Sequence, residues 1–344
     1  MSAPVQADRR AILAGMGALA LTGVAARGGA QDKPPAPQPG VTRIDPRLDA
    51  IVASDARIEV LGRGYKWAEG GVWVPRGDYL LFADPPNNIV YRWDAKGGVA
   101  PFLNPSGLQT PVPEGIKEPG ANGMRLDRAG RLVFADSGTR AIVRVDLTTR
   151  KRTVLADRYQ GKRFNSPNDL AIAKDGTIYF SDPPYGLKDA DASPLAEIGF
   201  NGLYRLTPDG KVTLVDRSRF RPNGVALSPD GRTLYLALSD PKLPQLLAYD
   251  IDARGMPGNP RVLHDMARWQ AQGLPGLPDG VKTAPDGTIF ATGPGGVHVL
   301  GADGTMLGLI ATGKAVANCC IGQSGRTLFM ASHDMLCRVA LRAG

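Results

Sequence analysis

The sequence is poor in side chains that bind transition metals or form disulfide frameworks. Its 344 residues include three cysteines and three histidines, and the cysteines lie near the C-terminus without a CxxC spacing. An odd count without this spacing excludes a disulfide framework and a zinc ribbon. Three histidines without an HExxH motif argue against a histidine-based zinc site. Cys320 and Cys337 are candidates for one disulfide, and buried free thiols are the alternative.

The sequence also lacks the motifs of several enzyme classes and any concentrated charge. It has no GxSxG motif and no P-loop, so neither a nucleophile elbow nor a phosphate cradle is predicted. Charged residues make up 22% of the chain, and the net charge of +8 is scattered, with no basic run longer than Arg150–Arg152. Without a basic patch, we expect a solvated basic surface and no nucleic-acid binding.

The N-terminus reads as a targeting segment. Asp8-Arg9-Arg10 precedes an apolar, Gly/Ala-rich run from Ala11 to Ala26, which is too short for a good membrane span. Paired arginines before such a run are typical of a twin-arginine export signal, with a Sec signal or an uncleaved anchor as alternatives. We therefore predict an export signal at residues 1–30, no stable membrane insertion after export, and a periplasmic or secreted protein. The Pro/Gln-rich residues 31–47 predict a disordered linker.

One spacing recurs along the rest of the chain. A polar residue is followed eight residues later by a glycine, and a short apolar stretch comes next. The pairs are Glu69 with Gly77, Asn122 with Gly130, Asn168 with Gly176, Asn223 with Gly231, and Asp279 with Gly287. A sixth glycine, Gly325, has Ala317 at the corresponding position. Each copy predicts a strand, a turn at the glycine, and a second strand.

The repeat predicts an all-β fold. Its glycines lie 53, 46, 55, 56 and 38 residues apart, which suits one four-stranded propeller blade per unit. Six units indicate a six-bladed β-propeller over residues 48–344, with residues 48–62 supplying the strand that closes the ring. A parallel α/β fold would need amphipathic helices between the strands, and the sequence shows none.

The polar residues of the repeat are candidate metal ligands. The first strand of each blade lines the central channel of a propeller, so residues at one register form a ring. That ring would contain Glu69, Asn122, Asn168, Asn223 and Asp279. Two carboxylates and three amides are hard oxygen donors, which suit calcium better than zinc and predict a central metal site. The alternative is that Asn-Gly and Asp-Gly pairs serve only the backbone geometry of turns.

Several short motifs, in order, resemble the SMP-30/gluconolactonase family. They are Trp67–Trp73 (WAEGGVW), Asn165–Asp169 (NSPND), Ser181–Gly186 (SDPPYG), Asn223-Gly224 and Pro278–Gly280 (PDG). The resemblance covers about residues 60–340. It implies a six-bladed propeller that holds one divalent cation, with calcium first and zinc, manganese or magnesium as alternatives.

The resemblance also implies roles for individual residues. The metal ligands would be Glu69, Asn168, Asn223 and Asp279, and Asn122 would face the substrate. Asn165, Tyr185 and Glu114 are further candidates for substrate contact. Asp279 would orient or activate the water that opens a small-molecule sugar lactone.

Fold and metal site do not by themselves fix the substrate. A calcium-dependent phosphotriester or aryl-ester hydrolase and a non-catalytic propeller plugged by calcium are the alternatives. The sequence assigns no oligomeric state.

Overall fold

A computed structural model describes residues 38–342. These residues all belong to one compact unit. The predicted export signal at residues 1–30 lies outside them. The predicted disordered linker enters the described residues at Gln38, and there Gly40–Arg43 instead form strand β1. No helix within residues 38–342 is long and apolar enough to cross a membrane.

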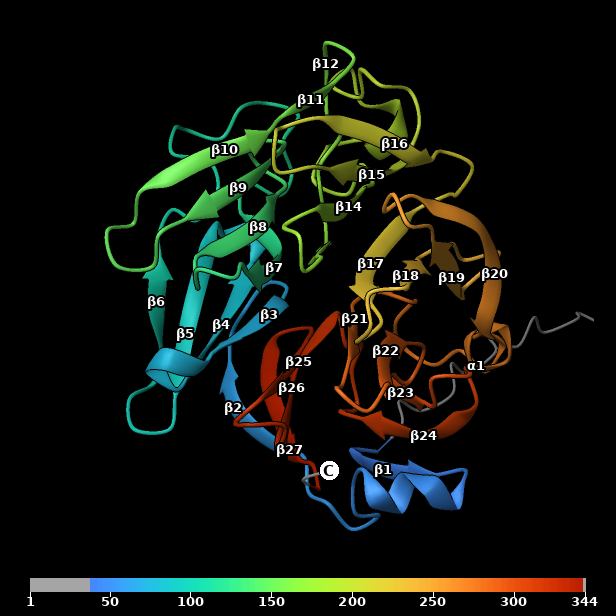
Figure 1. The fold of residues 1–344 in the computed structure, drawn as a ribbon. Helices are drawn as coiled ribbons and strands as arrows, with labels where there is room; N and C mark the ends of the chain where they lie inside the picture. Colours follow the sequence, from blue (N-terminus) through green and yellow to red (C-terminus); the bar gives the residue numbers. More distant parts are fainter. Residues whose placement is uncertain (1–37, 343–344) are drawn as a thin grey trace, which may run out of the picture. The chain divides into compact units, whose positions relative to one another are not determined.

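Residues 38–342 form six antiparallel sheets that surround a central axis (Figure 1), which confirms the predicted six-bladed β-propeller. Blade 1 contains β3 (Glu69–Val74), β4 (Tyr79–Asp84), β5 (Ile89–Asp94) and β6 (Gly98–Leu103). Blade 2 contains β7 (Ala121–Leu126), β8 (Leu132–Asp136), β9 (Ala141–Val145) and β10 (Arg152–Ala156). Blade 3 contains β13 (Leu170–Ile172), β14 (Ile178–Asp182), β15 (Gly202–Leu206) and β16 (Val212–Asp216).

Blade 4 contains β17 (Pro222–Leu227), β18 (Thr233–Leu238), β19 (Gln245–Ile251) and β20 (Pro257–Asp265). Blade 5 contains β21 (Val281–Thr283), β22 (Ile289–Gly293), β23 (Gly296–Leu300), β24 (Met306–Ala311) and the added β1. Blade 6 contains β25 (Asn318–Gly322), β26 (Thr327–Ser332), β27 (Met335–Ala340) and β2 (Glu59–Arg63).

Blade 6 is completed by a strand from the N-terminal part of the described chain. Strand β2 pairs with β27, with Glu59 opposite Arg338, so residues from the predicted segment 48–62 do close the ring. The same junction appears in Figure 1, where the blue β2 lies beside the red β27. Strand β1 pairs with β24 on the outer edge of blade 5. Propellers protect their sheet edges in this way.

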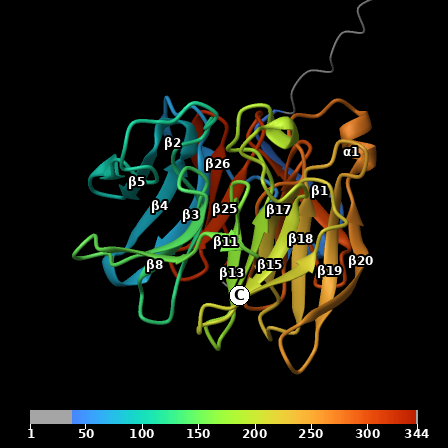
Figure 2. The ribbon, with the colours of Figure 1, turned by 90° about the horizontal axis from the view of Figure 1, so that it is seen from above.

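The remaining elements are short. A two-stranded hairpin joins β11 (Arg158–Tyr159) to β12 (Lys162–Arg163). The helices are η1 (Pro46–Ala50), η2 (Pro75–Gly77), η3 (Pro85–Asn87), η4 (Ala190–Ala192) and α1 (Ala267–Ala271). In the view of Figure 2 the strands of neighbouring blades run side by side, and α1 lies at one end of them.

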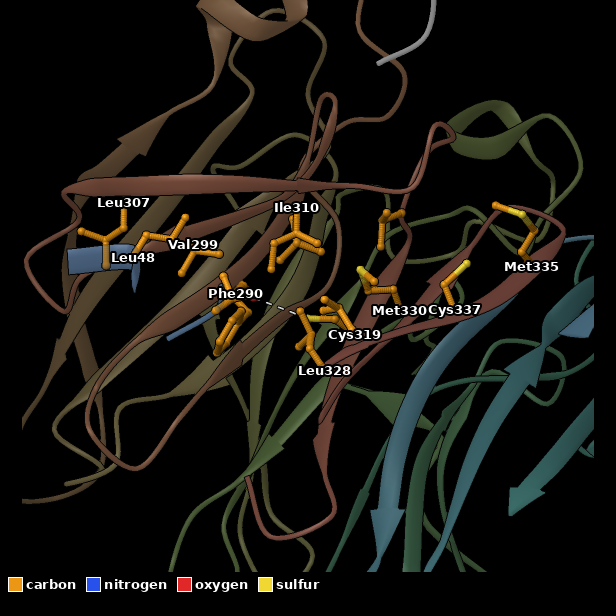
Figure 3. Packing of buried hydrophobic residues seen from close by; sticks show 14 residues of the cluster. Leu48, Phe290, Val299, Leu307, Ile310, Cys319, Leu328, Met330, Met335 and Cys337 are labelled. Atoms are coloured by element: carbon orange, nitrogen blue, oxygen red, sulfur yellow. Dashed lines mark hydrogen bonds between the residues drawn. The ribbon is translucent and has the colours of Figure 1, made fainter. Parts of the chain in front are cut away.

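The apolar core is divided among the blade interfaces. In one cluster Phe290 and Ile310 of blade 5 pack against Leu328 and Met330 of blade 6 (Figure 3). A comparable cluster joins blades 1 and 2. Burying a Leu, Ile or Phe side chain contributes about 1.5–3 kcal/mol, so each interface supplies a large stabilising term. The channel residues are therefore held by a packed interface on each side.

The cysteines belong to these interfaces. All three are free and buried, so Cys320 and Cys337 do not form the disulfide that the sequence left open. Burial raises the pKa of the Cys320 and Cys337 thiols to about 11, which keeps them protonated at neutral pH. The thiols pack as small apolar groups.

The repeated glycines sit at the predicted turns. Gly287, between β21 and β22, has φ +90°, a backbone conformation that residues with a side chain rarely adopt. Blade 1 differs, because Asp78 rather than Gly77 takes the left-handed conformation there, with φ +51°. Asn and Asp tolerate this region better than other residues with side chains.

Candidate active site

A cavity of about 500 Å³ opens at one end of the channel. All five polar residues of the repeat line it, as the sequence predicted, and we call them the oxygen ring: Glu69, Asn122, Asn168, Asn223 and Asp279. Each lies at or just before the first strand of its blade. Trp67, Tyr185 and Leu277 are among the other residues of the wall. The five side chains thus come from five blades to one cavity.

The sixth blade has no polar side chain at this register. One backbone hydrogen bond identifies the equivalent residue in different blades: its N–H donates to a carbonyl of the second strand of the same blade. This bond joins Asn168 to Ser181 at 3.0 Å, Asp279 to Thr292 at 3.3 Å, and Ala317 to Ala331 at 2.9 Å. Ala317 therefore occupies the blank position that the spacing predicted.

The glycines after the ring residues serve contacts between blades and not hairpin turns. A Cβ atom on Gly70 would lie 2.3 Å from the Asn122 carbonyl oxygen, and one on Gly224 would lie 2.0 Å from the Asp279 carbonyl oxygen. The Gly280 N–H donates to the Ala317 carbonyl at 2.7 Å. The Asn-Gly and Asp-Gly pairs therefore bring neighbouring blades close together around the channel.

Four oxygens of the ring are buried and have no hydrogen-bond partner among the described residues. They are Oδ1 of Asn122, Asn168, Asn223 and Asp279. Leaving a buried polar group unsatisfied costs about 1–3 kcal/mol, so four at one cavity need an explanation. A bound cation would satisfy them together.

The orientation of the Asn223 amide is fixed by its neighbours. Its Nδ2 donates to Ser239 Oγ at 2.9 Å, and that hydroxyl donates to the Pro278 carbonyl at 2.5 Å. Oδ1 is consequently the amide atom that remains without a protein partner. The same chain ties blade 4 to the residue just before Asp279.

The ionised forms of the two carboxyl groups of the ring are electrostatically unfavourable. Burial, and next the Asp169 carboxylate, raise the pKa of Glu69 to about 8. Burial also raises the pKa of Asp279 well above its usual range, and the Glu69 carboxylate adds to the effect. Among the described residues neither group forms an ion pair with Lys, Arg or His. A divalent cation between them would reverse this repulsion.

The donor set fits a hard divalent cation. Carboxylate and amide oxygens are the ligands of calcium, which accepts flexible geometry and six to eight oxygens. Within residues 38–342 no three His, Cys, Asp or Glu side chains gather into a metal-binding group. A metal here would depend on the amide oxygens, which argues for calcium over zinc.

A second polar group occupies the channel beyond the ring. We call it the charge network: Asp169, Arg125, Lys282 and Asn318. Asp169 is fully buried and lies 3.5 Å from Arg125 Nη1 and 3.9 Å from Lys282 Nζ. Lys282 also donates to Asn318 Oδ1 at 2.5 Å, and Arg125 donates to the Val225 carbonyl at 3.0 Å. Here the carboxylate charge has cations beside it.

Of the three other residues predicted to contact substrate, one lines the cavity and two do not. Tyr185 lines the cavity, whereas Glu114 is exposed and neither Glu114 nor Asn165 is in its wall. The Asn165 amide donates to the carbonyls of Asp182 and Phe200, at 3.1 and 2.8 Å. Its side chain therefore secures both ends of the insertion between β14 and β15.

Glu118 lines the cavity, and no pattern in the sequence marked it as a site residue. It lies in the long loop before β7, outside the repeated frame. The backbone N–H groups of Lys117 and Glu118 both donate to the Gly186 carbonyl, at 2.8 and 3.2 Å. Ile116 and Leu187 form an isolated β-bridge beside them. Two loops far apart in the sequence are thus joined at the cavity wall.

A model of the SMP-30/gluconolactonase/LRE-like region matches residues 67–334, most of the chain and nearly the whole propeller. The chain belongs to the SMP-30/gluconolactonase/LRE-like family. It is 47% identical to a gluconolactonase of Zymomonas mobilis over 86% of this chain and 85% of that protein. The family thus confirms the resemblance carried by the sequence motifs.

Two further relatives are similar to this chain, and their names give different activities. A gluconolactonase of known structure from Xanthomonas campestris superimposes with a TM-score of 0.75 at 30% identity, covering 89% of this chain and 96% of that one. A diisopropyl-fluorophosphatase of Loligo vulgaris is 25% identical over 69% of this chain and 76% of that protein. In sequence the chain is much more similar to the Zymomonas mobilis gluconolactonase than to this fluorophosphatase.

Proposed function

We propose that the protein is a lactonase that opens a sugar lactone by hydrolysis at the oxygen ring. The observation that carries the proposal is the set of four buried, unpartnered oxygens at one cavity. The 47% identity to a gluconolactonase supports the substrate class. Family membership and the shape of the cavity suit a small-molecule substrate.

Glu69, Asn168, Asn223 and Asp279 would hold one divalent cation, with calcium favoured over zinc, manganese and magnesium by the oxygen-only donor set. When bound, such an ion supplies a Lewis acid that polarises a carbonyl oxygen and stabilises negative charge on it. The Ser239 hydroxyl accepts a hydrogen bond from Asn223 Nδ2, so the amide oxygen Oδ1 is left available to a cation. The remaining ring member, Asn122, is left to contact the substrate.

Asp279 would position the attacking water. It retains some accessible surface at the cavity, and its Oδ1 has no protein partner among the described residues. A carboxylate that binds a dication is a weak base, because the positive charge lowers its pKa. Orienting the water is therefore its main task, and proton removal is secondary. Tyr185 would form one wall of the substrate pocket.

Metal dependence and substrate can be tested together. Hydrolysis of D-glucono-δ-lactone by the wild type should disappear after EDTA treatment and return when calcium is added. The Asp279→Asn variant should remain inactive even with calcium present. Glu59→Gln is a suitable control, because Glu59 is an exposed residue of β2 at the closing strand. Full activity in EDTA, or full activity of Asp279→Asn, would sink the proposal.

A second candidate, supported by the relative from Loligo vulgaris, is a calcium-dependent hydrolase of phosphotriesters or aryl esters on the same site. The same oxygen ring would serve a phosphoryl oxygen. Parallel assays with diisopropyl fluorophosphate, phenyl acetate and D-glucono-δ-lactone separate the two. Turnover of the phosphotriester or the aryl ester well above that of the lactone would favour this candidate.

We also propose that residues 1–30 direct export to the periplasm or beyond. The support is the Arg9-Arg10 pair before the apolar run. Replacing both arginines by lysine should retain the protein in the cytoplasmic fraction. Unchanged export of this variant would indicate a Sec signal instead.

A further inference from the structure

Lactone hydrolysis needs a proton donor that the oxygen ring does not provide. Water attacks the carbonyl carbon, and the bond from that carbon to the ring oxygen then breaks. The ring oxygen leaves as an alkoxide, which is a strong base and departs readily only if it receives a proton. The oxygens of Asn168, Asn223, Glu69 and Asp279 would serve as cation ligands, so the donor must come from elsewhere in the cavity.

Glu118 is a carboxyl group in the cavity wall that the cation site does not use. Its backbone is held against the insertion by the shared Gly186 carbonyl, and the neighbouring bridge of Ile116 with Leu187 secures the same contact. Among the described residues none hydrogen-bonds to its carboxyl group or forms an ion pair with it, and only burial and the Lys117 charge act on its pKa. The side chain is partly accessible from the cavity. A fixed backbone and an unengaged carboxyl group are what a proton donor requires.

We propose that Glu118 is the general acid that protonates the ring oxygen of the lactone as the acyl carbon–oxygen bond breaks. The inference rests on the proposed lactonase function. The Glu118 O–H bond breaks, its proton joins the departing oxygen, and the electron pair of the cleaved bond stays on that oxygen. The attacking water loses one proton to solvent, and Glu118 regains one from solvent. The products are the hydroxy acid as its carboxylate and one proton.

The surroundings of Glu118 suit this role. Burial raises the pKa of its carboxyl group to about 7, and the Lys117 ammonium opposes the rise. Asp279 and Tyr185 are the other titratable groups that its charge influences. A bound dication lowers this pKa somewhat, so the loaded enzyme titrates at or below neutral pH. The Tyr185 hydroxyl is the rival donor, but burial raises its pKa far above that of Glu118.

The test compares leaving groups in the variant Glu118→Gln, which keeps the shape and removes the acid. Two lactones without further hydroxyl groups are matched: δ-valerolactone expels an alkoxide, and dihydrocoumarin expels a phenoxide. We expect kcat/KM of the variant to fall about 100-fold for δ-valerolactone and D-glucono-δ-lactone. The value for dihydrocoumarin should change less than about threefold, because a phenoxide leaves without prior protonation. Glu59→Gln should leave all three rates unchanged.

Two further measurements distinguish a proton donor from a cation ligand or a purely structural residue. At a pH below the pKa of Glu118, where the wild-type carboxyl group is neutral, calcium affinity from titration calorimetry and the melting temperature should be the same in Glu118→Gln and wild type. The wild-type rate for δ-valerolactone, after subtraction of alkaline hydrolysis, should decline as pH rises through the pKa of Glu118, because the acid must be protonated. That decline should be absent in Glu118→Gln.

The outcomes are distinct. Equal losses for all three lactones, or loss of calcium binding, overturn the general-acid role. Loss for D-glucono-δ-lactone with unchanged δ-valerolactone turnover also overturns it, and assigns Glu118 to a substrate hydroxyl. If the wild type hydrolyses none of the lactones, the proposed function itself fails. If the wild type is a lactonase but Glu118→Gln slows all three lactones equally, only the general-acid role of Glu118 fails and the proposed function stands.

Discussion

The two polar groups of the channel hold buried carboxyl groups in opposite ways. In the oxygen ring, burial and then the Glu69 carboxylate raise the pKa of Asp279, neither carboxyl group forms an ion pair among the described residues, and four ring oxygens also have no partner there. In the charge network, Asp169 has Arg125 and Lys282 beside it. Both groups are built from the first strands of the blades or the residues just before them. The difference is whether the protein supplies its own positive charge or leaves that place to a ligand.

This difference separates structural burial of charge from functional burial. A compensated group such as the charge network holds the blades together, and a mutation there should act on stability. An uncompensated group is a cost in the free protein that ligand binding removes, so a mutation there should act on function and can even raise stability. Variants of the two groups should therefore differ in which of these properties they lose.

Asp279→Asn should have the largest effect, because it removes a carboxylate that both binds the cation and faces the water. We expect kcat/KM for D-glucono-δ-lactone to fall about 10³-fold. In EDTA the variant should melt at or above the wild-type temperature, because one of two repelling buried carboxyl groups has become neutral. Steady-state kinetics and calorimetric melts measure both. A marked loss of metal-free stability would contradict the uncompensated nature of the ring.

Lys282→Met should have the largest effect on stability, because it removes one of the two cationic side chains beside the buried Asp169 and leaves Arg125 alone. The free energy of unfolding should fall by about 3 kcal/mol in urea titrations, even with calcium present. Lys314→Met is the matched control. Lys314 lies only 2.6 Å from Asp334, but that pair is partly exposed, so its loss should cost less than about 1 kcal/mol. Equal effects would show that burial does not decide the difference.

Gly224→Ala should disturb the ring through the backbone. Its Cβ would meet the Asp279 carbonyl oxygen at 2.0 Å, so blades 4 and 5 must separate. We expect a loss of about 2 kcal/mol in unfolding free energy, together with weaker calcium binding. Gly258→Ala, where the nearest atom lies at 3.6 Å, should change stability by less than about 0.5 kcal/mol. Unchanged calcium affinity in Gly224→Ala would show that ring geometry tolerates blade movement.

Asn122→Ala should give the smallest effect, and it tests whether one ring residue contacts the substrate while the others bind the cation. If Asn122 contacts substrate only, KM should rise about tenfold, equivalent to one lost hydrogen bond, while the calcium dissociation constant stays within about threefold. Asn168→Ala should instead weaken calcium binding about tenfold or more. Titration calorimetry beside kinetics distinguishes them. Weakened calcium binding in Asn122→Ala would place all five residues in the metal shell.

Much of this arrangement could be predicted from the sequence because a propeller repeats one local pattern. The spacing from polar residue to turn glycine located the blades, the channel register and even the blank at Ala317. The reason for the paired glycines could not be read in the same way, since it depends on contacts between blades such as Gly224 with the Asp279 carbonyl.

The cavity wall was harder to predict because it comes from loops outside the repeat. Glu114 and Glu118 lie four residues apart in one loop, and only Glu118, whose backbone N–H bonds to the Gly186 carbonyl, lines the cavity. Asn165 lies within a family motif, but its amide is engaged with the insertion. Loop residues have no periodicity to fix their direction, so tertiary contacts decide it.

The pairing of β2 with β27 determines when the molecule can be completed during synthesis. Glu59 and Arg338, opposite each other in this pair, are separated by nearly the whole propeller in sequence. A nascent chain can assemble its early blades, but β2 keeps an open edge until the last strand has left the ribosome. Contacts between such distant segments form slowly, and unpaired edges recruit other strands. Premature termination before β27 should therefore yield an aggregating product and not a smaller working propeller.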